Sequence, residues 1–150
     1  MVFRKATLQD LPAIIALYAN DKLGKTREQF VIPLPKQYVE AFKNINEDKN
    51  QELIVLENDT NEVIGTLQLT YLQHLNRLGS LRVQIESVHI KTEYQGKGLG
   101  KTMFQWAINR AKEKGASIVQ LTSDKKRPEA IKFYQKLGFT ASHEGLKLQF

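Results

Sequence analysis

The amino-acid sequence predicts a single α/β (α+β) domain over residues 1–150, with a mixed, mostly antiparallel central sheet of about seven strands flanked by about four helices. The length of 150 residues is usual for one domain. Its 41% hydrophobic and 25% charged residues are close to the globular average, which excludes collagen-like, mucin-like and fully disordered chains. The element patterns follow the order β-α-α-β-β-β-α-β-α-β-β, which predicts antiparallel hairpins in the middle and one right-handed βαβ crossover after them.

Short apolar or alternating runs between turn residues indicate the strands. These runs cover residues 2–6, 53–56, 63–72, 81–90, 118–122, 139–141 and 146–150. The helices are expected from Thr7 onward, around 38–42, from Gly100 to Lys114, and from Arg127 to Leu137. Asp10 is the expected capping partner of Thr7. The polar segment 20–36 is the expected loop or lid.

The fourth strand carries a slip in its apolar alternation. On residues 81–85 the apolar side chains fall on odd numbers, whereas on 88–90 they fall on even numbers. Because strand side chains alternate with a period of two, one face can hold both sets only if the strand contains an extra residue. A β-bulge near Glu86-Ser87 would supply that residue. The alternative is a strand buried on both faces, where alternation carries no information.

Composition also limits the chemistry. The chain has no cysteine, so it has no disulfide, no thiolate nucleophile and no cysteine-based zinc site. The three histidines lack metal-ligand spacing, and no metal is expected. No apolar run reaches the ~18–20 residues of a membrane span, and no signal peptide is recognised, so a cytoplasmic protein without a membrane partner is expected. The net charge of +6 favours an anionic partner.

The segment Gln95-Gly-Lys-Gly-Leu-Gly100 lies between a predicted strand and a predicted helix. Glycines there allow the backbone to approach an anion, and the first amides of the helix point at it. The loop is one residue too short for the Walker A pattern, because position 95 is not glycine. The spacing G-x-G-x-G also differs from the dinucleotide-binding pattern G-x-G-x-x-G. The segment therefore predicts a phosphate site of another kind.

Two segments resemble the GNAT superfamily of acetyl-CoA-dependent N-acetyltransferases. Gln95, Gly98 and Gly100 match its acetyl-CoA loop, [QR]-x-x-G-x-[GA], and residues 130–139, A-I-K-F-Y-Q-K-L-G-F, match its A-x-x-F-Y-x-x-x-G-F signature. The predicted order of elements is similar over the whole chain. The resemblance implies a fold in which the fourth and fifth strands splay at a bulge, with acetyl-CoA as co-substrate in the V between them.

The resemblance also implies which residues contact the co-substrate. They are Val88, His89, Ile90, Gln95, Gly96, Lys97, Gly98, Leu99, Gly100, Lys101, Thr102 and Arg127. The strand residues of this set would line the pantetheine, and the loop residues would bind the pyrophosphate. Arg127 is a departure, since many family members have asparagine there; it either binds a phosphate or faces solvent. The side chain of His89 points away from that of Val88 and is expected to be structural.

Tyr134 matches the tyrosine that acts as general acid in the resembled family, and a neutral phenol can protonate a leaving thiolate. Glu86 falls at the predicted bulge, where it would take a proton from the amine or bind a cationic substrate. The backbone amide of Val88 is the implied oxyanion donor. A core aromatic at 134 and a solvated glutamate at 86 are the alternative interpretations. Without cysteine a cysteinyl intermediate is excluded, so direct attack in a ternary complex is expected.

The prediction is therefore an N-acetyltransferase acting on a small-molecule or peptide amine. Alternatives are a CoA-binding sensor of the same fold without turnover and, less favoured, a basic nucleic-acid-binding module, for which no binding signature is visible. The sequence names no acceptor. A homodimer is common in the resembled family, and Leu72, Leu75 and Leu78, if exposed, would suit an interface.

Overall fold

The computed structural model describes all residues 1–150 and contains one five-stranded sheet with the order β1-β2-β3-β4-β5. The strands are β1 (Val2–Lys5), β2 (Gln51–Glu57), β3 (Val63–Gln73), β4 (Leu81–Ile90) and β5 (Ile118–Gln120). The pairs from β1 to β4 are antiparallel, and β5 joins β4 in parallel through the expected crossover. The prediction of a mixed, mostly antiparallel sheet is confirmed.

Five helices accompany the sheet: α1 (Leu11–Ala19), α2 (Lys36–Glu47), α3 (Asn76–Gly79), α4 (Leu99–Glu113) and α5 (Pro128–Lys136). A 3-10 turn precedes α1, and the Asp10 carboxylate accepts the amide of Thr7 at 2.7 Å, as the capping pattern predicts. The short α3 was not expected; it is one turn in which Arg77 and Leu78 have positive φ. None of the helices combines the length and the apolar run that a bilayer crossing needs.

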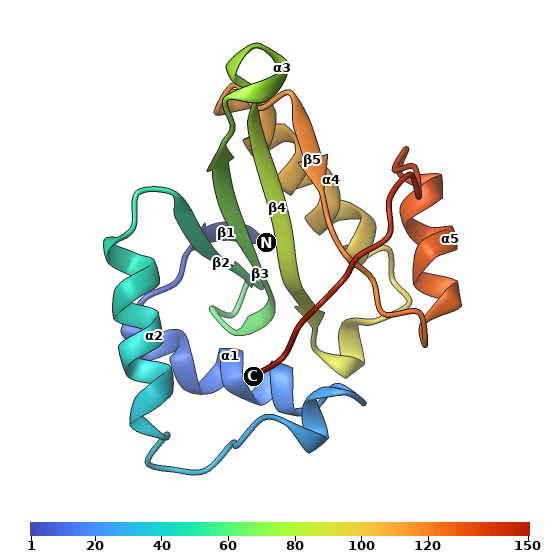
Figure 1. Cartoon of the computed structure of the whole chain (residues 1–150). Coiled ribbons are helices and arrows are strands. Elements are labelled where there is room, and N and C mark those ends of the chain that lie inside the picture. Colours follow the sequence, from blue (N-terminus) through green and yellow to red (C-terminus); the bar gives the residue numbers. More distant parts are fainter.

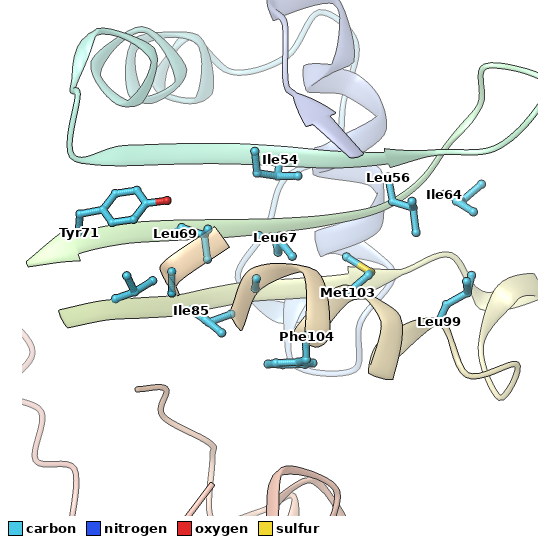
Figure 2. Close-up of a cluster of buried hydrophobic side chains, with 13 residues drawn as sticks. Ile54, Leu56, Ile64, Leu67, Leu69, Tyr71, Ile85, Leu99, Met103 and Phe104 are labelled. Carbon is cyan, nitrogen blue, oxygen red and sulfur yellow. The ribbon is translucent and has the colours of Figure 1, made fainter. Parts of the chain in front are cut away.

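The two faces of the sheet bury different helices. Alternate residues of β2 divide between two apolar clusters, with Ile54 and Leu56 on the α4 side and Leu53 and Val55 on the side of α1 and α2. Figure 2 shows strand side chains meeting those of α4, among them Met103. Each fully buried aliphatic side chain contributes about 1.5–3 kcal/mol. This layer holds α4 firmly against the strands.

The expected number of strands is wrong, because the structure has five strands and not seven. Residues 139–141 and 146–150 were expected to close the sheet, but neither segment forms a strand. No backbone of another strand lies beside them to complete a ladder, and the last eleven residues are all exposed. Alternation with a period of two indicates that a segment can form a strand, but it does not show that another strand is available to pair with it. The outer edge of β5 is consequently unpaired (Figure 1).

Candidate functional site

The sheet opens between β4 and β5. The two strands pair only from Arg82 opposite Ile118 to Gln84 opposite Gln120, and β4 then continues to Ile90 without a partner on that side. Figure 1 shows the two strands diverging toward the loop that precedes α4. The last residues of β4 thus offer an unpaired edge that an extended ligand can follow as an added strand.

A bulge lies at the start of this opening, as predicted. Thr66 of β3 is opposite His89 and Gln68 is opposite Glu86, so β4 has one residue more than β3 over this stretch. Ser87 has a φ of +52°, in the left-handed region. The bulge keeps the apolar residues before and after it on the α4 side: Leu81, Val83, Ile85, Val88 and Ile90 all belong to or pack against one cluster. The alternative of a strand buried on both faces is excluded, since Glu86 and Ser87 are exposed.

The glycine-rich turn leads directly into the N-terminus of α4. Gly98 is the N-cap residue with a φ of +83°, and Gly96 has a φ of +73°, both conformations that favour glycine. No side chain caps this 15-residue helix. The amides of Leu99, Gly100 and Lys101 have no intrahelical acceptor, and together with the helix dipole they form a site for an anion.

Two residues of the same turn have structural contacts. A Cβ built on Gly100 would lie 3.5 Å from Cζ of Phe133 and 3.7 Å from Cδ1 of Ile90, so α4 begins close to both α5 and β4. The Gln95 amide donates to the Ile90 carbonyl at 2.9 Å and ties the turn to the end of β4. These contacts fix the turn relative to the strand edge. Direct contacts of the two residues with a ligand stay predictions.

Tyr134 lies on α5 among aromatic rings. Its ring centroid is 5.3 Å from that of Phe104, 5.6 Å from Phe133 and 6.2 Å from Phe139. Burial raises the pKa of Tyr134, while the charge of Arg127 opposes the rise. Its hydroxyl is therefore protonated at neutral pH. Arg127 is exposed at the N-terminus of α5, and its charge adds to the larger effect of burial in lowering the pKa of His89.

The site residues that the sequence predicts on β4 divide between the two faces of the sheet. Val88 and Ile90 face α4, the side on which Tyr134 packs, whereas Glu86 and His89 face α1 and α2 because strand side chains alternate. At the opening between β4 and β5, groups from both faces of the sheet lie at one strand edge. Glu86 is exposed there, in keeping with either of its predicted roles.

Sequence reasoning missed a polar cluster on the α1 side of the opening. The ring of Tyr18 lies 5.0 Å from that of His89, and burial raises the pKa of Tyr18 to about 12 against the opposing effect of the Ser87 and Thr66 hydroxyls. Burial likewise lowers the pKa of His89, so its ring is neutral at pH 7. In the sequence, Tyr18 continues the apolar periodicity of Leu11, Ile14 and Ile15, and this pattern gives no sign of a contact with a residue 71 positions further along the chain.

The loop 20–35 approaches the same cluster. The Tyr38 hydroxyl donates to Glu28 at 2.7 Å and accepts the amide of Gln29 at 2.9 Å, which pins the loop to α2. The charges of Asp21 and Glu28 raise the pKa of His89 against the larger effect of burial, so both carboxylates lie toward this end of the strand. The predicted loop therefore supplies charged groups beside the bulge.

A cavity of about 330 Å³ lies elsewhere, between β1 and α4. Most of its charged side chains are already paired: Arg110 holds Glu52 through two hydrogen bonds of 2.6 and 3.0 Å, and Arg4 holds Asp10. Glu52 is only 4% exposed and also accepts the Tyr71 hydroxyl at 2.7 Å. Lys5 is the one charged side chain of this cavity without an ion-pair partner, so the cavity offers a ligand little free charge. No group of three or more His, Asp or Glu side chains is placed to hold a metal ion.

Comparison with known proteins agrees with this geometry. L-methionine sulfoximine/L-methionine sulfone acetyltransferase from Pseudomonas aeruginosa is 26% identical over 140 residues, covering 93% of this chain and 80% of that protein. Aminoalkylphosphonate N-acetyltransferase from Salmonella typhimurium is 29% identical over 85 residues; the match covers 55% of this chain and only about half, 53%, of that protein.

A solved structure is also similar throughout. A transcriptional regulator from Bacillus halodurans C-125 superposes with a TM-score of 0.95, is 48% identical and covers 99% of both chains. The acetyltransferase (GNAT) family matches residues 20–139, which include the bulge, the glycine-rich turn and Tyr134. The class of enzyme expected from the sequence, an acyltransferase, is confirmed at the level of the family. This chain belongs to the acetyltransferase (GNAT) family.

Proposed function

We propose that this protein transfers the acetyl group of acetyl-CoA to a primary amine by direct attack within a ternary complex. The observation that carries the proposal is the opening between β4 and β5, with the uncapped N-terminus of α4 at its wide end. An unpaired strand edge suits an extended amide-containing arm, and a helix N-terminus suits the phosphates attached to it. Acetyl-CoA has both parts and, when bound, supplies a thioester as acetyl donor.

The residues present fit this co-substrate. The left-handed Gly98 exposes backbone where a Cβ would meet no atom within 4 Å, so a pyrophosphate can approach the amides closely. Lys97 and Lys101 add positive charge beside them, and Arg127 can reach a phosphate from α5. Along β4, the backbone of residues 88–90 would hold the pantetheine. The proposed binding set is the one expected from sequence, with Gln95 and Gly100 acting mainly by holding the turn in place.

Three groups of this chain have proposed roles in the transfer. Glu86 accepts a proton from the attacking amine, directly or through water, or holds the cationic substrate. The Val88 amide donates a hydrogen bond to the carbonyl oxygen as negative charge develops there. Tyr134 donates its proton to the sulfur as the carbon–sulfur bond breaks. The new amide bond forms in the same encounter, because the chain has no cysteine to hold the acetyl group.

The acceptor is proposed to be a small amine that also carries an anionic group. The two acetyltransferases described above are named for aminoalkylphosphonates and for L-methionine sulfoximine and sulfone. Near the bulge, Asp21 offers negative charge for an ammonium group and Arg127 offers positive charge for an anion, whereas Glu28 already has Tyr38 and Arg27 as partners. A peptide amine is the other acceptor class to test.

The decisive experiment is a turnover assay with a panel of amines. Free CoA can be followed with a thiol reagent without background, because the protein itself contains no thiol. Aminoalkylphosphonates and amino acids should release CoA faster than amines without an anionic group. Acetyl-CoA binding without release for any amine in the panel would contradict the proposed catalysis.

A second candidate is regulation, favoured by the name of the Bacillus halodurans protein and by the net charge of +6. In that case the chain would bind CoA without turnover, or would bind a nucleic acid. Nucleic-acid binding through phosphate contacts weakens steeply with salt. A titration with duplex DNA at two salt concentrations, beside the turnover assay, separates this candidate from the enzyme.

A further inference from the structure

Tyr94 lies directly before the glycine-rich turn, as the last residue of a 3-10 turn that follows β4. Its ring is partly buried against the main apolar cluster, and the Lys97 ammonium lies 5.5 Å from the centre of that ring. A cation at this distance is attracted to the face of an aromatic ring. Lys97 immediately precedes Gly98, the N-cap residue of α4. The orientation of the Tyr94 ring therefore influences where the charge of Lys97 lies beside the anion site.

A side chain from a distant part of the sequence holds the Tyr94 hydroxyl. The side-chain amide of Asn58 donates to this hydroxyl at 3.0 Å, across 36 positions of the chain. The bond is the one hydrogen bond that the hydroxyl makes with the protein. A tyrosine with a buried ring usually has such a partner for its hydroxyl. Here the partner comes from the turn between β2 and β3.

Asn58 is held in one orientation because it organises that turn. Its side-chain oxygen accepts the amides of Thr60 and Glu62 at 3.0 and 2.9 Å. One of its side-chain N–H groups donates to the Glu62 carboxylate at 3.1 Å. Contacts between an asparagine side chain and the backbone that follows it are typical of turns. The remaining side-chain N–H is the one that reaches Tyr94.

A second link joins the same turn to the end of β4. Glu62 forms an ion pair with Lys91, the residue after β4, and the Lys91 amide donates to the Ile64 carbonyl at 2.8 Å. Beside this bond, Gly65 of β3 pairs with Ile90 of β4. The start of β3 is thus fixed against the end of β4, which places the β2–β3 turn beside the segment that leads into the glycine-rich turn.

We propose that Asn58 is a positioning residue for the phosphates of acetyl-CoA and that it acts through Tyr94, an inference that rests on the proposed function. By fixing the Tyr94 ring, Asn58 fixes Lys97 and the backbone that leads to Gly98 before the ligand arrives. Side chains that hold binding groups in their bound arrangement raise affinity, because less order has to be imposed on binding. The effect concerns the phosphate end of the co-substrate and leaves the reacting thioester unaffected.

Calorimetric titration with CoA tests the proposal. Tyr94→Phe keeps the ring and removes only the group that accepts the Asn58 N–H. Loss of one neutral hydrogen bond should weaken CoA binding by about 2–10-fold. Thr60→Val is the matched control: it removes a hydroxyl that donates to the Asn58 oxygen at 2.9 Å in the same turn, leaves the contact with Tyr94 in place, and should bind CoA as the parent does.

A double-mutant cycle identifies the link itself. Asn58→Ala should also weaken CoA binding, and Tyr94→Phe should have no further effect in the Asn58→Ala background, because both substitutions remove the same hydrogen bond. Two independent, additive losses would show that the two side chains act separately, which overturns the proposal.

Turnover with two acetyl donors separates positioning of the phosphates from a general loss of structure. S-acetylpantetheine carries the same thioester without the phosphates, so Tyr94→Phe should leave its kcat/KM unchanged while it raises the KM for acetyl-CoA at constant kcat. An equal loss with both donors, an equal loss of CoA binding in Thr60→Val, or a Tyr94→Phe variant that binds CoA as tightly as the parent overturns the proposal.

The parent chain distinguishes this inference from the proposed function. A parent that binds no CoA overturns both. A parent that binds CoA but releases none from acetyl-CoA with any amine refutes the proposed catalysis alone, and the calorimetric comparison of Tyr94→Phe with Thr60→Val still decides the role of Asn58.

Discussion

Removal of the Tyr134 hydroxyl is the sharpest test of the proposed chemistry. The substitution Tyr134→Phe keeps the ring, and the ring supplies the contacts with Phe104, Phe133 and Phe139. Neither a hydrogen bond nor a charged partner beyond Arg127 affects the pKa of this hydroxyl. Its loss should therefore leave the free energy of unfolding almost unchanged, while the proton donor for the leaving sulfur disappears.

The expected decrease in kcat follows from the proposed role of Tyr134 as general acid. A positioned general acid typically contributes ~10²–10⁴-fold, so kcat should fall by about that factor with acetyl-CoA affinity retained. Tyr71→Phe is the matched control, because it removes a hydroxyl that stabilises the fold and has no proposed role in catalysis. The Tyr71 hydroxyl donates to the buried Glu52 at 2.7 Å. A hydrogen bond to a charged group contributes about 1.5–3 kcal/mol. Tyr71→Phe should lower Tm by about 2–4 °C per kcal/mol and leave kcat unchanged.

The assay combines thiol release, calorimetric binding of acetyl-CoA and thermal unfolding for the parent and both variants. Because burial raises the pKa of Tyr134 above its ordinary value of about 10, the parent should stay active into alkaline pH and lose activity only as the phenol ionises. The Tyr134→Phe variant should lack that alkaline loss. An effect confined to KM, or a Tm drop as large as that of Tyr71→Phe, would show that Tyr134 is a core aromatic.

Three further outcomes are expected. Gly98→Val should abolish acetyl-CoA binding in calorimetry. Gly115→Val is the control: Gly115 has a φ of +81° and Gly98 a φ of +83°, so valine introduces the same backbone strain at the other end of α4, and this variant should bind acetyl-CoA normally. Glu86→Gln should slow kcat/KM most at low pH and recover as free amine becomes abundant; an unchanged pH profile would make Glu86 a solvated strand residue. Burial alone would raise the pKa of Glu52, but the hydrogen bonds from Arg110 and Tyr71 together with the charges of Arg110 and Lys114 outweigh burial, and the pKa is lowered. This stabilisation is present above the ordinary glutamate pKa and lost as pH falls through the lowered value, so urea unfolding of the parent and Glu52→Gln should converge in acid.

The features predicted best were those that local sequence determines. The slip between residues 81–85 and 88–90 required an extra residue, and the register of β3 and β4 contains it at Ser87. The glycines of residues 95–100 predicted an open backbone turn before a helix, and in the structure Gly96 and Gly98 have positive φ directly before α4. In each case a rule of local backbone geometry favours one conformation, so the prediction does not depend on contacts with residues distant in the sequence.

The features predicted worst depend on partners that sequence patterns do not specify. Residues 146–150 alternate as a strand does, yet no strand of the same chain accepts them. Tyr18 reads as one more apolar residue of its helix, although its ring meets His89 beside the bulge. The pairing of Glu28 with Tyr38 falls in a loop where no periodicity applies. Each miss concerns a contact between elements, and a pattern within one element cannot identify it.

The helix α4 explains why binding and stability should respond to different substitutions. Its N-terminus, at Gly98, faces the opening and lies against Ile90 of β4 through Gly100. Its last turn holds the buried Glu52 through Arg110, across the core on β2. Met103, fully buried between these ends, locks the helix to the strands. The anion site and the strand edge are therefore fixed relative to each other by packing along the helix. Loosening the ion pair at the far end should cost stability without displacing the amides at the near end, as long as the buried middle of the helix stays packed.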